Sequence, residues 1–142
     1  MGRYLPVACT VVIVGASLAT LLLVIHPNVI GCPGSQATSV IDCRAVVTSP
    51  GGRILGLPLG FWALVWLAAF WLVAGVRGPS RLWWMTPWAV VGVAYAVGTE
   101  LRVGHICAWC SLDQLAILTL AIWGTRQVGR RSAPDDQGGA VG

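Results

Sequence analysis

Long apolar runs separated by short polar segments organise this chain. Each run is close to the roughly 20 residues that a membrane-spanning helix needs. The third run is the shortest and contains Pro87, which is compatible with a kink or a shorter span. The pattern predicts an all-α membrane protein, a four-transmembrane-helix bundle within residues 1–131, with helices at about 5–25, 56–76, 82–101 and 106–125.

Two polar segments stand out between and after these runs. The segment at 26–55 is rich in Gly, Pro and Ser and carries Cys32 and Cys43, a composition typical of a flexible, solvated loop. The segment at 132–142 consists mainly of Gly, Asp, Gln and small residues, with little to bury. We therefore expect a cysteine-bearing loop outside the membrane and a disordered tail.

The overall composition agrees with a membrane protein. Of 142 residues, 56% are hydrophobic and only 10% are charged, against roughly 25% in soluble domains. The mean hydropathy is +0.77. The net charge of +4 comes from single arginines scattered between apolar runs, without the basic stripe of a nucleic-acid surface. We expect a lipid bilayer around the protein and no nucleic-acid partner.

The arginines predict the orientation of the bundle. All nine basic residues are Arg. Three of them, Arg44, Arg53 and Arg102, lie in the 26–55 loop or in the turn before the fourth helix. The other six lie at the opposite helix ends: Arg3, Arg77, Arg81, Arg126, Arg130 and Arg131. The positive-inside rule places both termini in the cytoplasm and the loop outside. The use of Arg without Lys hints at a bacterial genome, so we expect the bacterial plasma membrane.

The candidate chemistry lies in four of the five cysteines. Cys107-Ala108-Trp109-Cys110 is a C-x-x-C at the start of the fourth run, where helix N–H groups stabilise a thiolate. This spacing suits a redox disulfide or half of a zinc site, with Cys32 and Cys43 as the remaining ligands. Covalent haem attachment is excluded because residue 111 is Ser instead of His.

The loop pair alone is compatible with a static disulfide that ties the loop. The predicted topology, however, places Cys32 and Cys43 on the same side of the membrane as Cys107 and Cys110. Two dithiols on one side favour a relay by thiol–disulfide exchange. A non-enzymatic metal-binding or assembly protein with four cysteine zinc ligands is the alternative; the relay requires no resident metal.

The order of these motifs resembles a known family. Cys43 is followed by the runs Val47-Thr48-Ser49-Pro50 and Gly56-Leu57-Pro58-Leu59, and the C-x-x-C follows Ile106 at a helix start. This order resembles the bacterial form of the vitamin K epoxide reductase family over about residues 5–125. The resemblance implies a four-helix bundle around a pocket for a membrane quinone, either menaquinone or ubiquinone.

The resemblance also implies a role for each cysteine. Cys110 faces the quinone, Cys107 is its partner, Cys43 exchanges with Cys107, and Cys32 meets the substrate thiol. The implied activity is a quinone-dependent thiol oxidoreductase that reoxidises an extracytoplasmic thioredoxin-like protein and supports disulfide formation. Many bacterial relatives carry a fused thioredoxin-like domain, and because this chain ends first, we expect a separate partner protein.

Further candidate residues come from the resemblance and from burial in the membrane. Ser49 matches a Ser or Thr that the family keeps near the quinone, and Gln114 stands where some animal members have Tyr. Asp113 is a functional candidate because an acid within a membrane helix is costly. Its alternative role is an interfacial acid that pairs with Arg102 or caps the helix. Glu100 is expected in a surface ion pair with Arg102.

Overall fold

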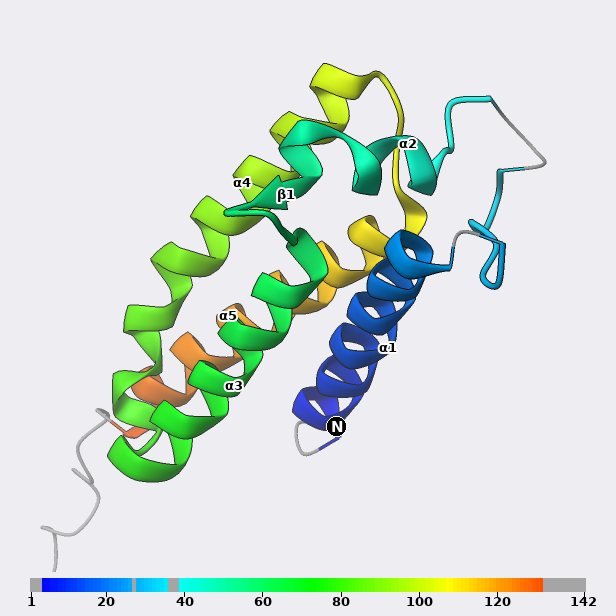
Figure 1. The fold of residues 1–142 in the computed structure, drawn as a ribbon. Helices are drawn as coiled ribbons and strands as arrows, with labels where there is room; N and C mark the ends of the chain where they lie inside the picture. The colour runs from blue at the N-terminus through cyan, green and yellow to red at the C-terminus, as the bar shows by residue number, and fades with distance from the viewer. Residues whose placement is uncertain (1–3, 27, 36–38, 132–142) are drawn as a thin grey trace, which may run out of the picture.

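The computed structural model describes residues 4–26, 28–35 and 39–131, and these residues are mostly helical. The long helices run alternately in opposite directions (Figure 1). They are α1 (Leu5–Ile25), α3 (Leu59–Arg77), α4 (Met85–Val103) and α5 (Ala108–Arg131). The disordered tail predicted at 132–142 lies outside the described residues.

Short elements connect the long helices. The connection from α1 to α3 contains the helix α2 (Cys43–Thr48), the 3-10 helix η1 (Pro50–Gly52) and an antiparallel hairpin of β1 (Arg53–Ile54) and β2 (Leu57–Pro58). A second 3-10 helix, η2 (Pro79–Trp84), joins α3 to α4. In Figure 1, α2, the hairpin and the α4–α5 connection gather at one end of the bundle. We call this end, residues 40–58 and 102–110, the cysteine end.

The described arginines divide between the two ends of the bundle. Arg44 on α2, Arg53 on β1 and Arg102 on the last turn of α4 belong to the cysteine end. The opposite end holds Arg77, Arg81 and Arg126. The side of the membrane that each end faces stays a prediction from the positive-inside rule.

The second half of the predicted flexible loop is ordered, so that prediction was wrong for residues 40–55. Ile41 forms a parallel bridge with Ile106, where the Asp42 N–H donates to the Ile106 oxygen at 3.1 Å and the Ile106 N–H donates to the Val40 oxygen at 2.9 Å. The Asp42 carboxylate then caps α2 by accepting from the Ala45 N–H at 3.0 Å. The segment is ordered because its apolar side chains, which include Val46 and Val47, are buried in a hydrophobic cluster.

The helix α3 begins at Leu59 instead of residue 56 because the hairpin occupies the preceding residues. Leu55 and Gly56 form its two-residue turn and both have positive φ, 55° and 79°. A type I′ hairpin turn requires positive φ at both positions, which Gly adopts without strain. The Leu-Gly-Leu-Pro run therefore ends a hairpin and only then starts a helix.

The helix α4 begins at Met85 instead of residue 82 and is not interrupted by Pro87. Pro87 lies in the first turn of α4, where its missing N–H costs no helical hydrogen bond. The residues before Met85 form the 3-10 helix η2, and the Met85 N–H donates to the Leu82 oxygen at its end. The residues that the pattern assigned to a membrane helix at 82–84 belong to this connection.

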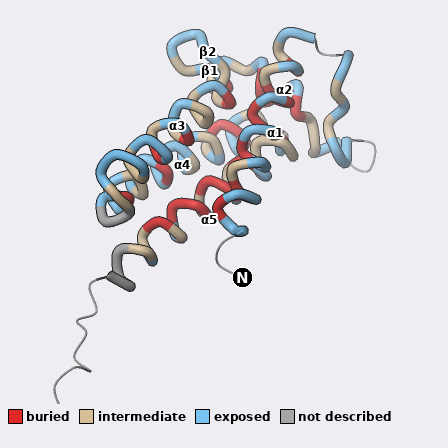
Figure 2. The backbone as a smooth tube through the Cα atoms, turned by 90° about the horizontal axis from the view of Figure 1, so that it is seen from below, coloured by how far each residue is buried: buried red, intermediate tan, exposed pale blue. Residues whose placement is uncertain are grey.

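Burial is uneven among the long helices. Figure 2 shows buried stretches along α1 and α5, whereas α3 and α4 are largely exposed. Large apolar side chains account for much of that exposed surface, including Leu72, Val76, Trp88 and Val91. An apolar exterior of this extent is typical of a surface that faces lipid.

Two helices, α1 and α3, are long and apolar enough to cross a bilayer, as judged by length and composition among the described residues. The other two long helices carry charged or polar side chains, Glu100 and Arg102 on α4 and Asp113 and Gln114 on α5. These residues lower the hydropathy of α4 and α5. The fold is thus mostly helical with two candidate membrane spans among the described residues, and four spans remain the prediction.

Candidate functional site

The two cysteine pairs meet at the cysteine end of the bundle. Cys43 and Cys107 are both 0% exposed and belong to one buried cluster with Leu23, Val46 and Val47. Cys32 and Cys110 pack against the edges of this cluster. The bridge between Ile41 and Ile106 explains why the two pairs lie close together, because Cys43 comes two residues after Ile41 and Cys107 directly follows Ile106.

The loop pair forms a disulfide between Cys32 and Cys43, with the Cα atoms 5.6 Å apart. The backbone N–H of Cys43, the first residue of α2, donates to the Cys32 sulfur at 3.2 Å. The Trp109 indole N–H donates to the Gly31 oxygen at 3.2 Å, which links the Cys32 segment to the C-x-x-C. The loop pair, Cys32 and Cys43, therefore contacts the cysteines of the C-x-x-C, Cys107 and Cys110, instead of moving freely in solvent. We call Cys107 and Cys110 the helix pair.

The helix pair holds two free thiols at the start of α5. Cys107 directly precedes the helix, where a capping residue lies, and the Cys110 N–H donates to the Cys107 sulfur at 3.2 Å. The sulfur thus takes the place of the oxygen that usually accepts from the first turn. An N–H donor directed at this sulfur stabilises negative charge on it when a disulfide to Cys107 opens.

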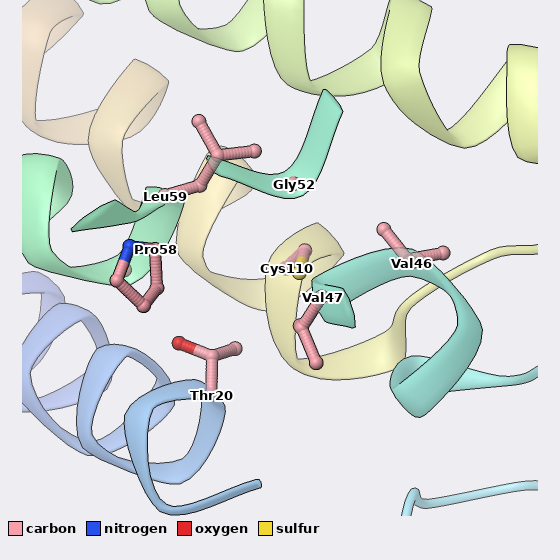
Figure 3. Close-up of a pocket in the computed structure, with 8 residues that line it drawn as sticks. Thr20, Val46, Val47, Gly52, Pro58, Leu59 and Cys110 are labelled. Carbon is pink, nitrogen blue, oxygen red and sulfur yellow. The ribbon is translucent and has the colours of Figure 1, made fainter. Parts of the chain in front are cut away.

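Cys110, the second cysteine of the helix pair, lines two cavities inside the protein. In Figure 3 its side chain lies next to Val47 of α2, with Thr20 of α1 and Pro58 of the hairpin around the same small void of about 10 Å³. Cys110 also lines a second and much larger cavity. Cys110 is therefore the cysteine that connects the buried cluster to open space inside the bundle.

The larger cavity has a volume of about 460 Å³ and lies among α3, α4 and α5. Trp62 and Trp66 line it, and their indole N–H groups donate to the backbone oxygens of Ile54 and Met85, so apolar ring surface remains for the cavity. Its few polar side chains include Thr20, Cys110, Asp113 and Gln114. A few hundred Å³ of apolar space with a few convergent polar groups is typical of a small-molecule site.

The acids near the cavity differ from the prediction. Glu100 is only 9% exposed, and its Oε1 accepts from the Gln114 Nε2 at 3.4 Å. The prediction that Glu100 forms a surface ion pair with Arg102 was therefore wrong. Asp113 neither pairs with Arg102 nor caps α5. It is buried, and its Oδ2 accepts from the Ser17 hydroxyl of α1 at 3.1 Å. Sequence reasoning missed Ser17, whose only signal was a polar residue in the middle of an apolar run.

Ser49 does not line either cavity that Cys110 lines. Its hydroxyl donates to the Val46 oxygen at 2.7 Å and accepts from the Gly52 N–H at 3.0 Å. Ser49 therefore terminates α2 and caps η1, and its place near the quinone stays a prediction from the resemblance. The other cofactor-binding candidates, Cys110, Asp113 and Gln114, all line the larger cavity.

The zinc alternative gains no support from this geometry. Zinc ligation requires free thiolates in a tetrahedral set, but two of the four sulfurs are joined in the Cys32–Cys43 disulfide. Across residues 4–26, 28–35 and 39–131, no group of three or more His, Cys, Asp or Glu side chains is arranged to hold a metal ion.

A comparison with known protein families agrees with the resemblance in the motifs. The chain matches the Vitamin K epoxide reductase family over residues 6–125. No curated protein and no solved structure matches it. Members of this family are membrane-associated, act on thiols and use quinones in general. The motif order, the paired cysteines and the match over most of its length together identify the chain as a member of the vitamin K epoxide reductase family.

Proposed function

We propose that this protein is a quinone-dependent thiol oxidoreductase. It oxidises a separate extracytoplasmic thioredoxin-like protein and passes the electrons through Cys32–Cys43 and Cys107–Cys110 to a membrane quinone, thereby supporting disulfide formation. The observation that carries this proposal is the burial of Cys43 and Cys107 in one cluster, with Cys110 on a 460 Å³ apolar cavity.

The first exchange takes place at the loop pair. A thiolate of the partner attacks the Cys32 sulfur, which is more exposed than that of Cys43, and the Cys32–Cys43 bond breaks. The released Cys43 thiolate attacks Cys107 of an oxidised helix pair, and Cys110 leaves as a thiolate. The partner's second thiol then resolves the bond to Cys32, and the partner departs oxidised.

The second exchange restores the loop pair. The Cys32 thiolate attacks Cys43 of the Cys43–Cys107 bond, and Cys107 leaves as a thiolate. The Cys110 N–H, which donates to the Cys107 sulfur, stabilises the charge on this leaving group. The Cys110 and Cys107 thiolates then take up, through water, the two protons that the partner's thiols lost. The result is an oxidised loop pair and a reduced helix pair, the redox state that the structure contains.

The residues around the large cavity fit a quinone. A quinone supplies an acceptor for two electrons and two protons on a flat, largely apolar ring. The indole rings of Trp62 and Trp66 suit such a ring, and Gln114 and Asp113 suit its oxygen atoms. Trp88, also in the lining, is exposed on α4, so the cavity borders the apolar exterior from which a lipid-soluble molecule would enter.

Purified protein will reduce a short-chain ubiquinone when it receives electrons from a reduced thioredoxin-like donor. Cys107→Ser and Cys110→Ser will each lower the rate by at least about 100-fold, because each removes a sulfur that forms a covalent intermediate. Cys9→Ser serves as the matched control, since Cys9 packs in a different cluster. The loss of quinone absorbance measures the rate. Equal rates in all variants would contradict the proposal.

We also propose that all four long helices span the bacterial plasma membrane, with both termini in the cytoplasm. After mild reduction of intact cells, a membrane-impermeant thiol reagent will label Cys32 in preference to Cys43, which is fully buried. Mass spectrometry of the labelled peptides measures this, and Cys32→Ser is the control. Labelling that requires a breached membrane would reverse the orientation.

A further inference from the structure

We propose that Ser17 is a positioning residue that holds the carboxyl group of Asp113 with its second oxygen free toward the large cavity, where Asp113 carries a proton to the bound quinone. This inference rests on the proposed function and deepens it. It assigns a role to Ser17 and a specific atom, Oδ1 of Asp113, to the proton transfer.

The burial of both residues is the first observation. Ser17 is 0% exposed on α1 and Asp113 is 7% exposed on α5. The Ser17 hydroxyl donates to Oδ2 of Asp113 at 3.1 Å, whereas Oδ1 is buried without a hydrogen-bond partner among the described residues. A buried polar atom without a partner is costly and calls for an explanation. Because Asp113 lines the large cavity, an occupant of that cavity can supply the partner.

The helical register is the second observation. Cys110, Asp113, Gln114 and Ile117 are spaced i, i+3, i+4 and i+7 on α5, and all four line the cavity. Residues three and four apart on a helix are surface neighbours about 5–6 Å apart at Cβ. The carboxyl group of Asp113 is therefore adjacent to the thiol that the proposed function places next to the quinone.

The close contact between α1 and α3 gives Ser17 its rigidity. A Cβ atom on Gly60 of α3 would collide with the Thr20 hydroxyl and reach the Ser17 backbone oxygen at 3.0 Å. The Thr20 hydroxyl in turn donates to that same oxygen at 2.8 Å. The helix turn that carries Ser17 is thus fixed against α3, and the hydroxyl is held where Asp113 needs a donor.

The proton balance defines what Asp113 does. Joining the thiols of Cys107 and Cys110 in a disulfide releases two electrons and two protons. Both electrons pass to the quinone, which also takes up two protons. Oδ1 of Asp113 takes one proton from Cys110 and gives it to the nearer quinone oxygen, so Asp113 ends as it began. The second proton leaves the Cys107 thiol to water, and water supplies an equal proton to the other oxygen. The sum is one disulfide and one quinol.

The test combines spectroscopy with kinetics. Infrared difference spectra on addition of a short-chain ubiquinone should show a carboxyl band that disappears in Asp113→Asn and shifts in Ser17→Ala. Turnover should fall on the order of 100-fold in Asp113→Asn, the scale of general acid–base catalysis, with little change in quinone KM. In Ser17→Ala it should fall about fivefold, the scale of one hydrogen bond.

Thr119→Ala is the matched control, because its hydroxyl donates only to the Leu115 backbone oxygen of the same helix at 2.7 Å. It should leave both the band and turnover unchanged. A band that is identical in Ser17→Ala and the parent protein, or full turnover in Asp113→Asn, would overturn the inference. Absence of quinone reduction by the parent protein would instead overturn the proposed function. Asp113→Asn nearly preserves shape and can still accept from Ser17, which separates proton transfer from folding.

Discussion

A variant that combines Cys32→Ser with Cys110→Ser will accumulate an internal disulfide between Cys43 and Cys107. In the proposed relay these two sulfurs form the central mixed disulfide, and the two removed thiols are the groups that would resolve it. We expect this bond in most of the protein, because no resolving thiol remains beside it. Non-reducing digestion followed by mass spectrometry identifies and quantifies the linked peptides.

The structure explains why this pair is favoured. The Asp42 N–H bonds to the Ile106 oxygen at 3.1 Å, so the residues that follow, Cys43 and Cys107, begin side by side. Both are fully buried in the same cluster, which excludes competing thiols from solution. A disulfide requires Cα atoms within roughly 7 Å, and the hydrogen bond between the preceding residues holds the two backbones next to each other.

The control variant combines Cys43→Ser with Cys110→Ser and leaves Cys32 and Cys107. Cys32 lies at the edge of the cluster and, in the proposal, faces the partner protein. We expect much less internal disulfide in this variant. Equal amounts in the two variants would mean that the loop cysteines are interchangeable, and the order of the proposed electron transfer would be wrong.

Filling the large cavity will separate quinone reduction from thiol exchange. Gly92→Phe should lower quinone reduction by at least about tenfold, equivalent to a loss of about 1.4 kcal/mol in transition-state binding. Gly92 lines the cavity, and a Cβ atom placed there meets no other atom within 4 Å. The new ring therefore enters open space that we assign to the quinone instead of distorting the helix.

Exchange between the cysteine pairs should continue in Gly92→Phe, because the buried cysteine cluster does not include α4 residue 92. The matched control is Gly98→Phe on the same helix, which also has open space at its Cβ but does not line the cavity. Quinone reduction and the redox state of each cysteine would be measured in parallel. A similar loss in both variants would indicate a general effect on α4, and the cavity would lose its assignment.

Much of the architecture follows from local patterns in the sequence. The uncharged run at 5–25 predicts a helix, and α1 covers Leu5–Ile25, because an unbroken apolar run of this length can bury its backbone only as a helix in lipid. The C-x-x-C at 107–110 identifies a dithiol by spacing alone, and the order of motifs around it indicates the family that the comparison matched. These features depend on neighbouring residues and so are visible in the chain itself.

Features that depend on contacts between distant residues were decided by the tertiary structure. Polar composition predicted a flexible loop, but the bridge between Ile41 and Ile106 orders it and brings the two cysteine pairs together. In the sequence, Ser17 is only one polar residue in an apolar run. Its partner Asp113 on α5 lies 96 residues further along the chain, and only the fold brings the two together. Composition and periodicity describe one segment at a time, whereas these pairings arise only when the helices pack and a polar group must find its partner across the bundle.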